Sequence, residues 1–549
     1  MAGKDDGSFG LDPALVKQID WDLALRRVVQ DLGSDFIWAP HFRYICREAG
    51  TQLIELVKRE LTAGQFSPGV PMTIEVPKSF RMRVGGSTKR FGPSFTRPGS
   101  ILPLKDRLLY QVIGDRCLTF VEQKSLKDRS FSHRSAAAND DAMFMANRSC
   151  WNLLQEALSR HASKRKFQYV VKMDIANYFQ SVNLHELVNT LSGNGLESAL
   201  VYPLESMLVK YTGERSSRGI IQGVNTSDLF GAFYLHPIDR LMKDGKWTSA
   251  RYVDDIYVFV STLKEADKVI RTLVPKLRNY DLVLNEIKSV VMPTSLLRVE
   301  EPDLESLFGD AIEEISGQDD DALSEGYGHQ RDWWDDEGDE DDVDDEDIEL
   351  KATRLLFDSL ADYPGQEEHI ERFCIPLFAR AESDYAIDHI MASFSQRPSM
   401  TQIYVHYLSK FVSRSNVTRF LEKALDDITL YDWQGMWVLA ALMQRGKGSD
   451  SAVTSAWRIL DDGRRHDAVR AVAALFVGRF GPHDRRKELF GIYPNLSEYV
   501  RLAVYFSSLR WKGVERSNAR KMWGSNDEMH RLMTTAATVG RQTKSLSGK

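Results

Sequence analysis

The sequence predicts an α+β fold followed by an all-α region of helical repeats. Three observations lead to this prediction. Residues from about 11 to 315 mix apolar patterns of strand period with patterns of helix period. A strongly acidic stretch covers about 316–350, and from about 350 to 540 the pattern is helical nearly throughout. With 549 residues the chain is too long for one compact core, so we expect several domains.

These patterns predict boundaries at 1–315 for the α+β domain, 316–350 for a disordered acidic insert or linker, and 351–549 for the helical domain. Between Asp319 and Glu349 stand 17 Asp and Glu residues and one basic residue, Arg331, a net charge of −16. Such charges repel one another and leave too few apolar residues for a core. Two interpretations stay open: a solvated tether, or an acidic arm that docks through Trp333 and Trp334.

The charge of the rest of the chain points to a polyanionic partner. The whole chain carries −7, so the residues outside the acidic stretch sum to +9. A basic body suits a protein that binds nucleic acid. Four widely spaced cysteines without a CxxC pattern argue against a disulfide scaffold or a zinc module. The N-terminus lacks a signal-peptide core and no apolar run approaches membrane-spanning length, so we expect a cytoplasmic protein that does not bind membranes.

Helix-period patterns are clearest in the C-terminal third of the chain. Ser449 or Asp450 is placed to cap one of these helices. Small residues in 466–481 resemble a helix of a HEAT-like repeat, although the array follows no strict period, so an irregular helical domain is the alternative. The expected helices cover 401–413, 417–425, 433–444, 452–460 and 466–481.

Arginine-rich stretches in the same third offer phosphate contacts. They lie at 457–470, 483–490 and 510–521, and Trp511 and Trp523 beside the last are candidates for base stacking. The alternative is that these basic residues face solvent and pair with nearby acids.

The strongest local signal is RYVDDIYVFV at 251–260. Its flanks are rich in β-branched and aromatic residues, which predicts a hairpin with Asp254 and Asp255 in the tight turn. Two adjacent carboxylates repel each other unless solvent or a cation neutralises them. An Asp-rich turn without further function would be the simpler interpretation of this segment taken alone.

A third carboxylate changes that interpretation. The run FQYVVKMDIANYFQSV at 167–182 places Asp174 at the end of a predicted strand. Together with Asp254 and Asp255 it completes a set suited to two Mg²⁺ ions about 4 Å apart, one for a 3′-hydroxyl and one for a triphosphate. Magnesium prefers such hard oxygen ligands, with Mn²⁺ as a substitute.

The ordered motifs of residues 20–300 resemble those of reverse transcriptases. The similar segments are TRPGSILPLKDR (96–107) for the fingers, DIANYF (174–179) for motif A, GIIQGVNTSDLFGAFYL (219–235) for motif B, YVDD (252–255) for motif C and LNEIKS (284–289) for motif D. The resemblance implies a right-hand polymerase fold, with fingers and a palm whose antiparallel sheet is packed by helices. It also implies that Asp174, Asp254 and Asp255 are the catalytic, metal-binding aspartates.

The same resemblance implies roles for five more residues, which would bind the nucleotide. Phe179 matches the bulky gate that selects deoxynucleotides, with a core phenylalanine as the alternative. Gln222 and Gly223 match the motif B pair beside the incoming nucleotide and the template. Arg97 matches the fingers residue that clamps the triphosphate. Lys288 matches the motif D lysine proposed to donate a proton to pyrophosphate, with a solvated surface lysine as the alternative.

The order of domains along the chain indicates which subgroup of reverse transcriptases the sequence resembles. The segment after motif D lacks the VTG signature of retron enzymes, and no zinc-type endonuclease pattern follows. A palm followed by a helical array is similar to the defence-associated bacterial reverse transcriptases of the abortive-infection and "unknown group" classes. That similarity implies RNA-directed or untemplated DNA synthesis in antiphage defence and a homo-oligomer. The implied partners are dNTPs, an RNA template or non-coding RNA, and a DNA product.

Two alternatives to this function stay open. One is a retron or group II intron-like reverse transcriptase of a mobile element. The other is a catalytically idle scaffold that binds RNA through a retained fold.

Overall fold

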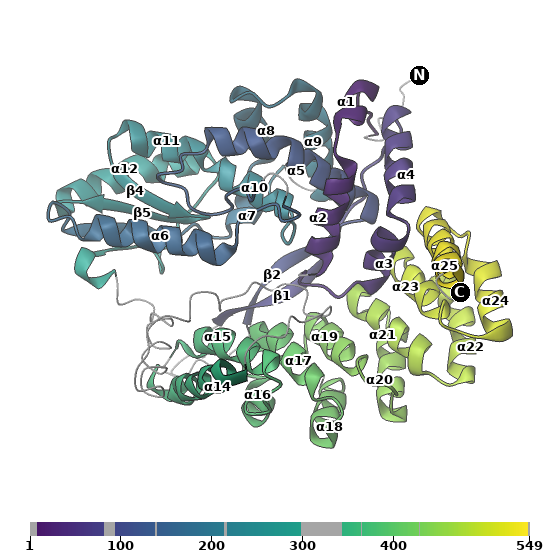
Figure 1. Cartoon of the computed structure of the whole chain (residues 1–549). Helices are drawn as coiled ribbons and strands as arrows, with labels where there is room; N and C mark the ends of the chain where they lie inside the picture. The colour runs from purple at the N-terminus through teal and green to yellow at the C-terminus, as the bar shows by residue number, and fades with distance from the viewer. Residues whose placement is uncertain are drawn as a thin grey trace.

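The computed structural model describes residues 8–33, 35–81, 94–137, 140–213, 217–297, 343–363, 365–427 and 429–546. Figure 1 shows an upper α+β part, a lower arc of helices, and a long β-hairpin between them. This arrangement confirms the predicted fold class. The helices that open the chain are α1 (Pro13–Gln18), α2 (Trp21–Gly33), α3 (Pro40–Glu48) and α4 (Gly50–Thr62).

The long hairpin, which we call the fingers hairpin, consists of β1 (Met72–Arg81) and β2 (Ser94–Ile101). The two strands are antiparallel, with Met72 opposite Ile101 and Val76 opposite Arg97. The next two helices are α5 (Leu104–Lys124), which is buried along much of its length, and α6 (Asn147–Ala162).

A four-stranded antiparallel sheet, the palm sheet, has the order β4-β5-β3-β6. Alternate residues of β5 face opposite cores: Tyr257 and Phe259 pack with α6, whereas Ile256 and Val258 pack into the main core with α12. Burial on both faces explains the continuous apolar run after the paired aspartates. The strands are β3 (Tyr169–Met173), β4 (Thr248–Tyr252), β5 (Asp255–Val260) and β6 (Val290–Pro293); the surrounding helices are α7 (Tyr178–Ser181), α8 (Leu184–Gly193), α9 (Ser198–Tyr211), α10 (Asn225–Tyr234), α11 (His236–Asp244) and α12 (Leu263–Asn279).

The predicted hairpin at 251–260 is present, but its turn lies one residue earlier than expected. Tyr252 pairs with Asp255, so Val253 and Asp254 form the turn and Asp255 is the first residue of β5. The sequence expectation placed both aspartates in the turn. The register is set by burial of the alternating β5 side chains, which the turn has to accommodate.

The C-terminal region is an arc of helices in which α15, α17, α19, α21 and α23 pack successively (Figure 1). All five expected helices are present, and Ser449 caps α20 by accepting a hydrogen bond from the Ala452 N–H (3.1 Å). The helices are α14 (Val343–Asp358), α15 (Glu367–Arg380), α16 (Ile387–Ser393), α17 (Thr401–Lys410), α18 (Ser415–Ala424), α19 (Asp432–Leu442), α20 (Asp450–Asp461), α21 (Asp467–Phe480), α22 (His483–Ile492), α23 (Glu498–Ser508), α24 (Gly513–Trp523) and α25 (Glu528–Leu546).

The first of these helices begins inside the predicted linker. Residues 343–350 belong to α14, which corrects the boundary drawn at 350; residues 316–342, including Trp333 and Trp334, lie outside the described residues. Acidic residues are favourable in the first turn of a helix because they interact with its positive end, so a run of acids does not by itself exclude helix. None of the helices within the described ranges combines the length and apolar character needed to cross a membrane.

One contact between the helical arc and the α+β part lies at the short segment after α2, at Asp35 and Phe36. The indole N–H groups of Trp433 and Trp437 donate to the Phe36 carbonyl at 2.7 and 3.2 Å. The Gln402 side chain donates to the Asp35 carbonyl at 3.1 Å. The 3₁₀ turn at Pro398–Met400 and helix α19 also pack against β1, and at the far end of the arc α25 packs against α3.

Replacing Trp433 by Phe tests this joint. The change keeps an aromatic ring but removes the donor to the Phe36 carbonyl, which should lower the free energy of unfolding by about 1–3 kcal/mol. Denaturant unfolding measures the loss. Trp457→Phe on the outer helix α20 is the matched control, because the Trp457 indole N–H donates to no described residue. Equal stability of the two variants would contradict the assigned role of the joint.

Candidate active site at the palm turn

Three aspartates meet at one end of the palm sheet. Asp174 follows the last residue of β3, and Met173 at that end pairs with Ile256 of β5. Continuing this register places Asp174 opposite the start of β5, where Asp255 stands beside the turn residue Asp254. The structure therefore brings together the three carboxylates that the sequence separates by about 80 residues.

Burial and repulsion from neighbouring carboxylates make Asp254 and Asp255 hard to ionise. Burial raises the pKa of Asp255 to about 6, with further increases from the charges of Asp254 and Asp174. The pKa of Asp254 is also raised, chiefly by burial and then by Asp174, while Lys288 opposes the shift. Carboxylates that are buried and crowded in this way are typical of a cation site.

The donor set fits a hard divalent ion in the type of its ligands. Carboxylate oxygens are the ligands that magnesium prefers, and the mutual repulsion of these side chains is what a cation would relieve. The carboxyl groups do not form a finished cage, since no group of three or more His, Cys, Asp or Glu side chains among the described residues is arranged to hold a metal. The Asp174 carboxylate instead contacts the Lys288 ammonium at 3.3 Å.

The turn between β4 and β5 has a strained backbone, which hydrogen bonds with Ser132 and Arg251 hold in place. Val253 has a φ of +49°, a left-handed conformation that a β-branched residue rarely adopts. Its N–H donates to the Ser132 hydroxyl at 3.0 Å, and its carbonyl accepts a 2.7 Å bond from the Arg251 guanidinium. These two bonds hold the peptide units on either side of Val253, the second of which leads into Asp254.

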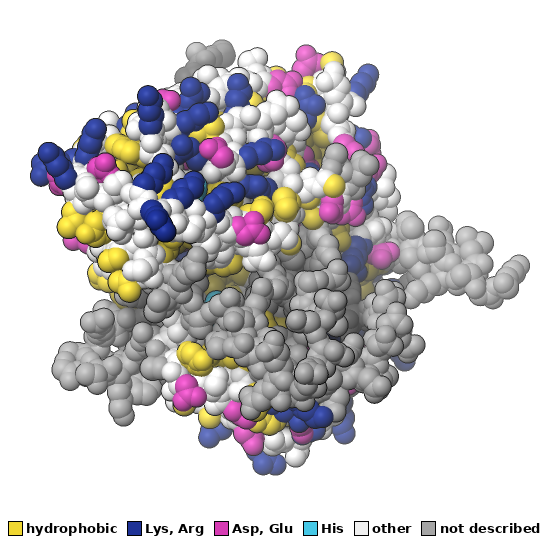
Figure 2. Space-filling view, turned by 60° about the vertical axis from the view of Figure 1, so that its left-hand side comes forward, with side chains coloured by type: hydrophobic (Ala, Val, Ile, Leu, Met, Phe, Trp, Pro, Cys, Tyr) yellow, Lys and Arg dark blue, Asp and Glu magenta, His cyan; other side chains and the backbone are white. Residues whose placement is uncertain are grey.

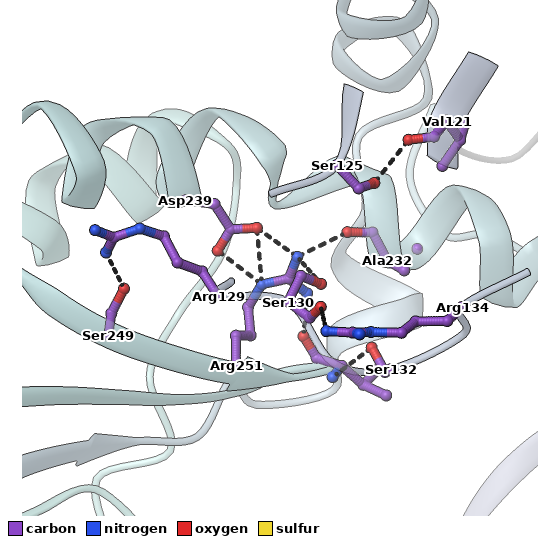
Figure 3. A network of polar contacts seen from close by, with 12 residues as sticks. Val121, Ser125, Arg129, Ser130, Ser132, Arg134, Ala232, Asp239, Ser249 and Arg251 are labelled. Carbon is purple, nitrogen blue, oxygen red and sulfur yellow. Dashed lines mark hydrogen bonds and ion pairs between the residues drawn. The ribbon is translucent and has the colours of Figure 1, made fainter. Parts of the chain in front are cut away.

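Arg251 is the centre of a buried polar network (Figure 3). Its guanidinium binds the Asp239 carboxylate of α11 at 2.6 Å, and both side chains are only 2% exposed. It also donates to the Ala232 carbonyl and to the Ser130 hydroxyl, each at 3.1 Å. The sequence analysis did not identify this residue, although an arginine within a buried strand was a visible signal.

Cations from the fingers hairpin face the carboxylates. Partial burial lowers the pKa of Arg97 in β2, as does the nearby Arg372, while Asp254 opposes this effect. Burial likewise lowers the pKa of Lys78 in β1, where repulsion from Arg97 and Lys288 opposes attraction to Asp254 and Asp174. The sequence patterns did not single out Lys78, which lies on β1 in the structure.

Motif B is fixed against the fingers by the Phe36 ring. Gly223 has a φ of +94°, and a methyl group there would overlap Phe36; a methyl group at Gly99 of β2 would overlap the same ring. The Gln222 carbonyl accepts a hydrogen bond from the Ser100 N–H at 3.1 Å. The structure thus places Gln222 and Gly223 beside the fingers strand that carries Arg97.

Phe179 lies next to this group rather than in the interior of the sheet. It is half-buried in the short helix α7, and its ring contacts Gly231 of α10. The neighbouring Tyr178 hydroxyl donates to the Gly231 carbonyl at 2.6 Å, which fixes α7 on α10. This position leaves part of the Phe179 ring exposed.

Residues 88–301 match the family model described as "Reverse transcriptase (RNA-dependent DNA polymerase)". The chain carries a reverse transcriptase domain. The matched range contains all eight site residues predicted from the sequence, and Lys78 lies outside it. No curated protein matches the chain.

Solved structures similar to the chain include three telomerases from two Candida species. The telomerase from Candida albicans, in complex with a fragment of telomeric RNA, has 10% identity and a TM-score of 0.30, over 71% of this chain and 66% of its own. The apo telomerase from Candida tropicalis has 10% identity and a TM-score of 0.28, over 88% and 74%. The Candida tropicalis complex with telomeric RNA has 12% identity and a TM-score of 0.28, over 72% and 65%. The match thus spans slightly less than two thirds of two of these telomerase chains.

Basic side chains gather over the palm of the reverse transcriptase domain in the upper half of Figure 2. Around His161 at the end of α6, burial lowers the pKa of the imidazole to about 4, and Lys164, Arg160, Arg129 and Lys166 lower it further in that order. The dominance of positive neighbours around one imidazole indicates a surface suited to phosphates.

The base-stacking prediction for the C-terminal region is wrong. Trp511 and Trp523 are buried at 6% and 2% exposure, and Trp523 stacks on Tyr493 with ring centroids 4.5 Å apart. Several arginines of the predicted phosphate-binding stretches pair with acids, for example Arg465 with Asp432 at 2.5 Å. Apolar burial between helices, which a local pattern does not reveal, decided the position of both indoles.

Gly223→Ala should destabilise the reverse transcriptase domain by about 1–3 kcal/mol, because the new methyl group meets both an unfavourable φ and the Phe36 ring. Thermal and denaturant unfolding measure the loss. Gly193→Ala is the control: a methyl group there meets no atom within 4 Å at the end of helix α8, so its stability should be unchanged or slightly higher. A stable Gly223→Ala protein would show that the Phe36 contact is not restrictive.

The double variant Asp254→Asn, Asp255→Asn should be more stable than the wild type in chelator-treated buffer at neutral pH. Removing two repelling buried charges should raise the free energy of unfolding by about 1–2 kcal/mol. Asp267→Asn, which removes an exposed carboxylate paired with Arg271 on α12, should change it by less than about 0.5 kcal/mol. A destabilised double variant would mean that the carboxylates stabilise the metal-free fold.

Proposed function

We propose that the reverse transcriptase domain synthesises DNA, RNA-directed or untemplated, by phosphoryl transfer at Asp174, Asp254 and Asp255. The observation that carries this proposal is the convergence of these three carboxylates opposite the basic fingers hairpin. Carboxylates at one wall and cations at the other suit a nucleotide triphosphate with its divalent ions.

The carboxylates would bind metal ions, and the basic fingers residues bind phosphate. Asp174, Asp254 and Asp255 would hold two Mg²⁺ ions, with Mn²⁺ as a substitute. When bound, these ions would ease deprotonation of the primer 3′-hydroxyl and offset the charge of the pyrophosphate. Arg97 and Lys78 bind the phosphate oxygens by charge-assisted hydrogen bonds.

The remaining site residues set the outcome of the reaction. Lys288, already beside Asp174, donates a proton to the departing pyrophosphate. Phe179 excludes nucleotides with a 2′-hydroxyl and so selects dNTPs. Gln222 and Gly223 support the template base opposite the incoming nucleotide.

We further propose that this polymerase acts in antiphage defence, with RNA as template or bound non-coding RNA and with a homo-oligomeric assembly. The support is the layout of the chain: a reverse transcriptase domain followed by an α-helical array docked on its fingers. The carboxylates and the basic fingers residues argue against a catalytically idle scaffold. A protein that only bound RNA would not need an acidic turn that destabilises its fold.

Primer extension tests the catalytic proposal. The purified protein with Mg²⁺, a primed RNA template and dNTPs should extend the primer, or should build untemplated DNA without one. Asp174→Asn should lower the rate by roughly 10³-fold or more, because a ligand that acts in the transition state is lost. Asp267→Asn should retain full activity. Absence of synthesis by the wild type under both conditions, or an unaffected Asp174→Asn variant, would refute the proposal.

Phage challenge tests the defence role separately. Bacteria that express the wild-type protein should give fewer phage plaques than bacteria that express Asp254→Ala, Asp255→Ala. Equal plaque counts across a broad phage panel, together with an intact activity in vitro, would favour a mobile-element function instead.

A further inference from the structure

The helical region also reaches the neighbourhood of the candidate site. Helix α15 is joined to the 3₁₀ turn at Pro398–Met400 because the Ser399 hydroxyl donates to Glu368 at 2.8 Å and Arg397 pairs with Glu371. That turn packs against β1 of the fingers hairpin. In Figure 1, α15 accordingly lies beneath the hairpin on the side of the palm.

Arg372 of α15 is the residue that this docking brings to the site. Its half-buried side chain lies close enough to Arg97 for the two positive charges to repel each other, and Arg97 in turn interacts with Asp254. The neighbouring acid Glu371 is fully buried and bound by Arg397 and by the Tyr404 hydroxyl (2.6 Å). Arg372 forms no ion pair or hydrogen bond with any other described residue through its side chain.

Three positive charges near the site have no direct ion pair with another described residue. Lys78 and Arg97, like Arg372, have no carboxylate at ion-pair distance within the described ranges. Arg97 lies between two like charges, Lys78 on the neighbouring strand and Arg372 on α15, and this repulsion costs free energy in the unliganded protein. An anion with several charges at short spacing would remove that cost.

We propose that Arg372 binds the polyphosphate of the incoming nucleotide together with Arg97 and Lys78, so that the helical region completes the nucleotide site. This inference rests on the proposed polymerase function. A nucleotide polyphosphate presents several negative charges within a few bonds, whereas a nucleic-acid strand spreads them along its axis. A row of three cations, Arg372, Arg97 and Lys78, in which Arg97 and Lys78 interact with the turn residue Asp254, matches the compact anion.

The assignment also gives the docking of the helical region a function. Because Arg372 reaches the site only when α15 is fixed on the fingers, nucleotide binding and docking are coupled. The planar guanidinium can bind two phosphate oxygens at once, which a lysine cannot do.

Single-nucleotide incorporation at varied dNTP concentration tests the proposal. Arg372→Ala should raise KM for the dNTP on the order of tenfold or more, with a smaller change in Arg372→Lys, while the dissociation constant for the primer–template stays within about twofold. The inhibition constant of inorganic tripolyphosphate should rise by the same factor, since this probe contains the phosphates without base or sugar.

Arg380→Ala is the matched control, because Arg380 lies on the same helix but is exposed and paired with Glu349 at 2.6 Å. It should leave KM and the tripolyphosphate inhibition constant unchanged. Melting temperatures of Arg372→Ala and Arg372→Lys establish that both fold. An unchanged KM in a folded Arg372→Ala protein, or weaker primer–template binding in place of the KM effect, would overturn the role of Arg372. A wild type without incorporation would instead overturn the proposed function.

Discussion

The position of Phe36 is the constraint on which the arrangement of the molecule depends. Its ring fills the space beside two glycines, Gly99 in the fingers and Gly223 in motif B, and its carbonyl accepts the indole N–H groups of Trp433 and Trp437. One residue therefore fixes the fingers, the palm and the helical arc relative to one another. The preceding Asp35 is held by the buried Arg107 at 2.6 Å, so the segment cannot shift without exposing an ion pair.

In the unliganded protein, repulsion between like charges is unfavourable on both sides of the candidate site. Carboxylates repel one another at the palm turn, and cations repel one another on the fingers. Two buried features hold the arrangement in place: the Arg251–Asp239 pair behind the strained turn, and the docking joint behind the fingers. A site prepared for charged ligands commonly depends on such support from well-packed surroundings.

The helical arc contacts the reverse transcriptase domain through specific hydrogen bonds at one end and through α25, packed against α3, at the other. An ion pair between Lys105 of α5 and Glu528 of α25 (3.2 Å) strengthens the second contact. Contacts at two ends make a hinge between the parts less favourable than a fixed arrangement. The arc is thus placed to contribute to the site, and Arg372 is the residue through which we propose it does so.

The sequence by itself determined the local elements and the chemistry of the catalytic turn. Alternating or periodic apolar residues predict strands and helices because burial of one face is a local requirement, and Asp174, Asp254 and Asp255 could be recognised because each stands at a strand end. Only the tertiary structure decided which residues meet. Arg372 and Phe36 contact residues far away in the chain, Lys78 and Asp239 interact with residues on other elements, and Trp511 and Trp523 became core residues instead of stacking platforms. The physical reason is that charge neutralisation and close packing depend on distances in space, which no local pattern of residues encodes.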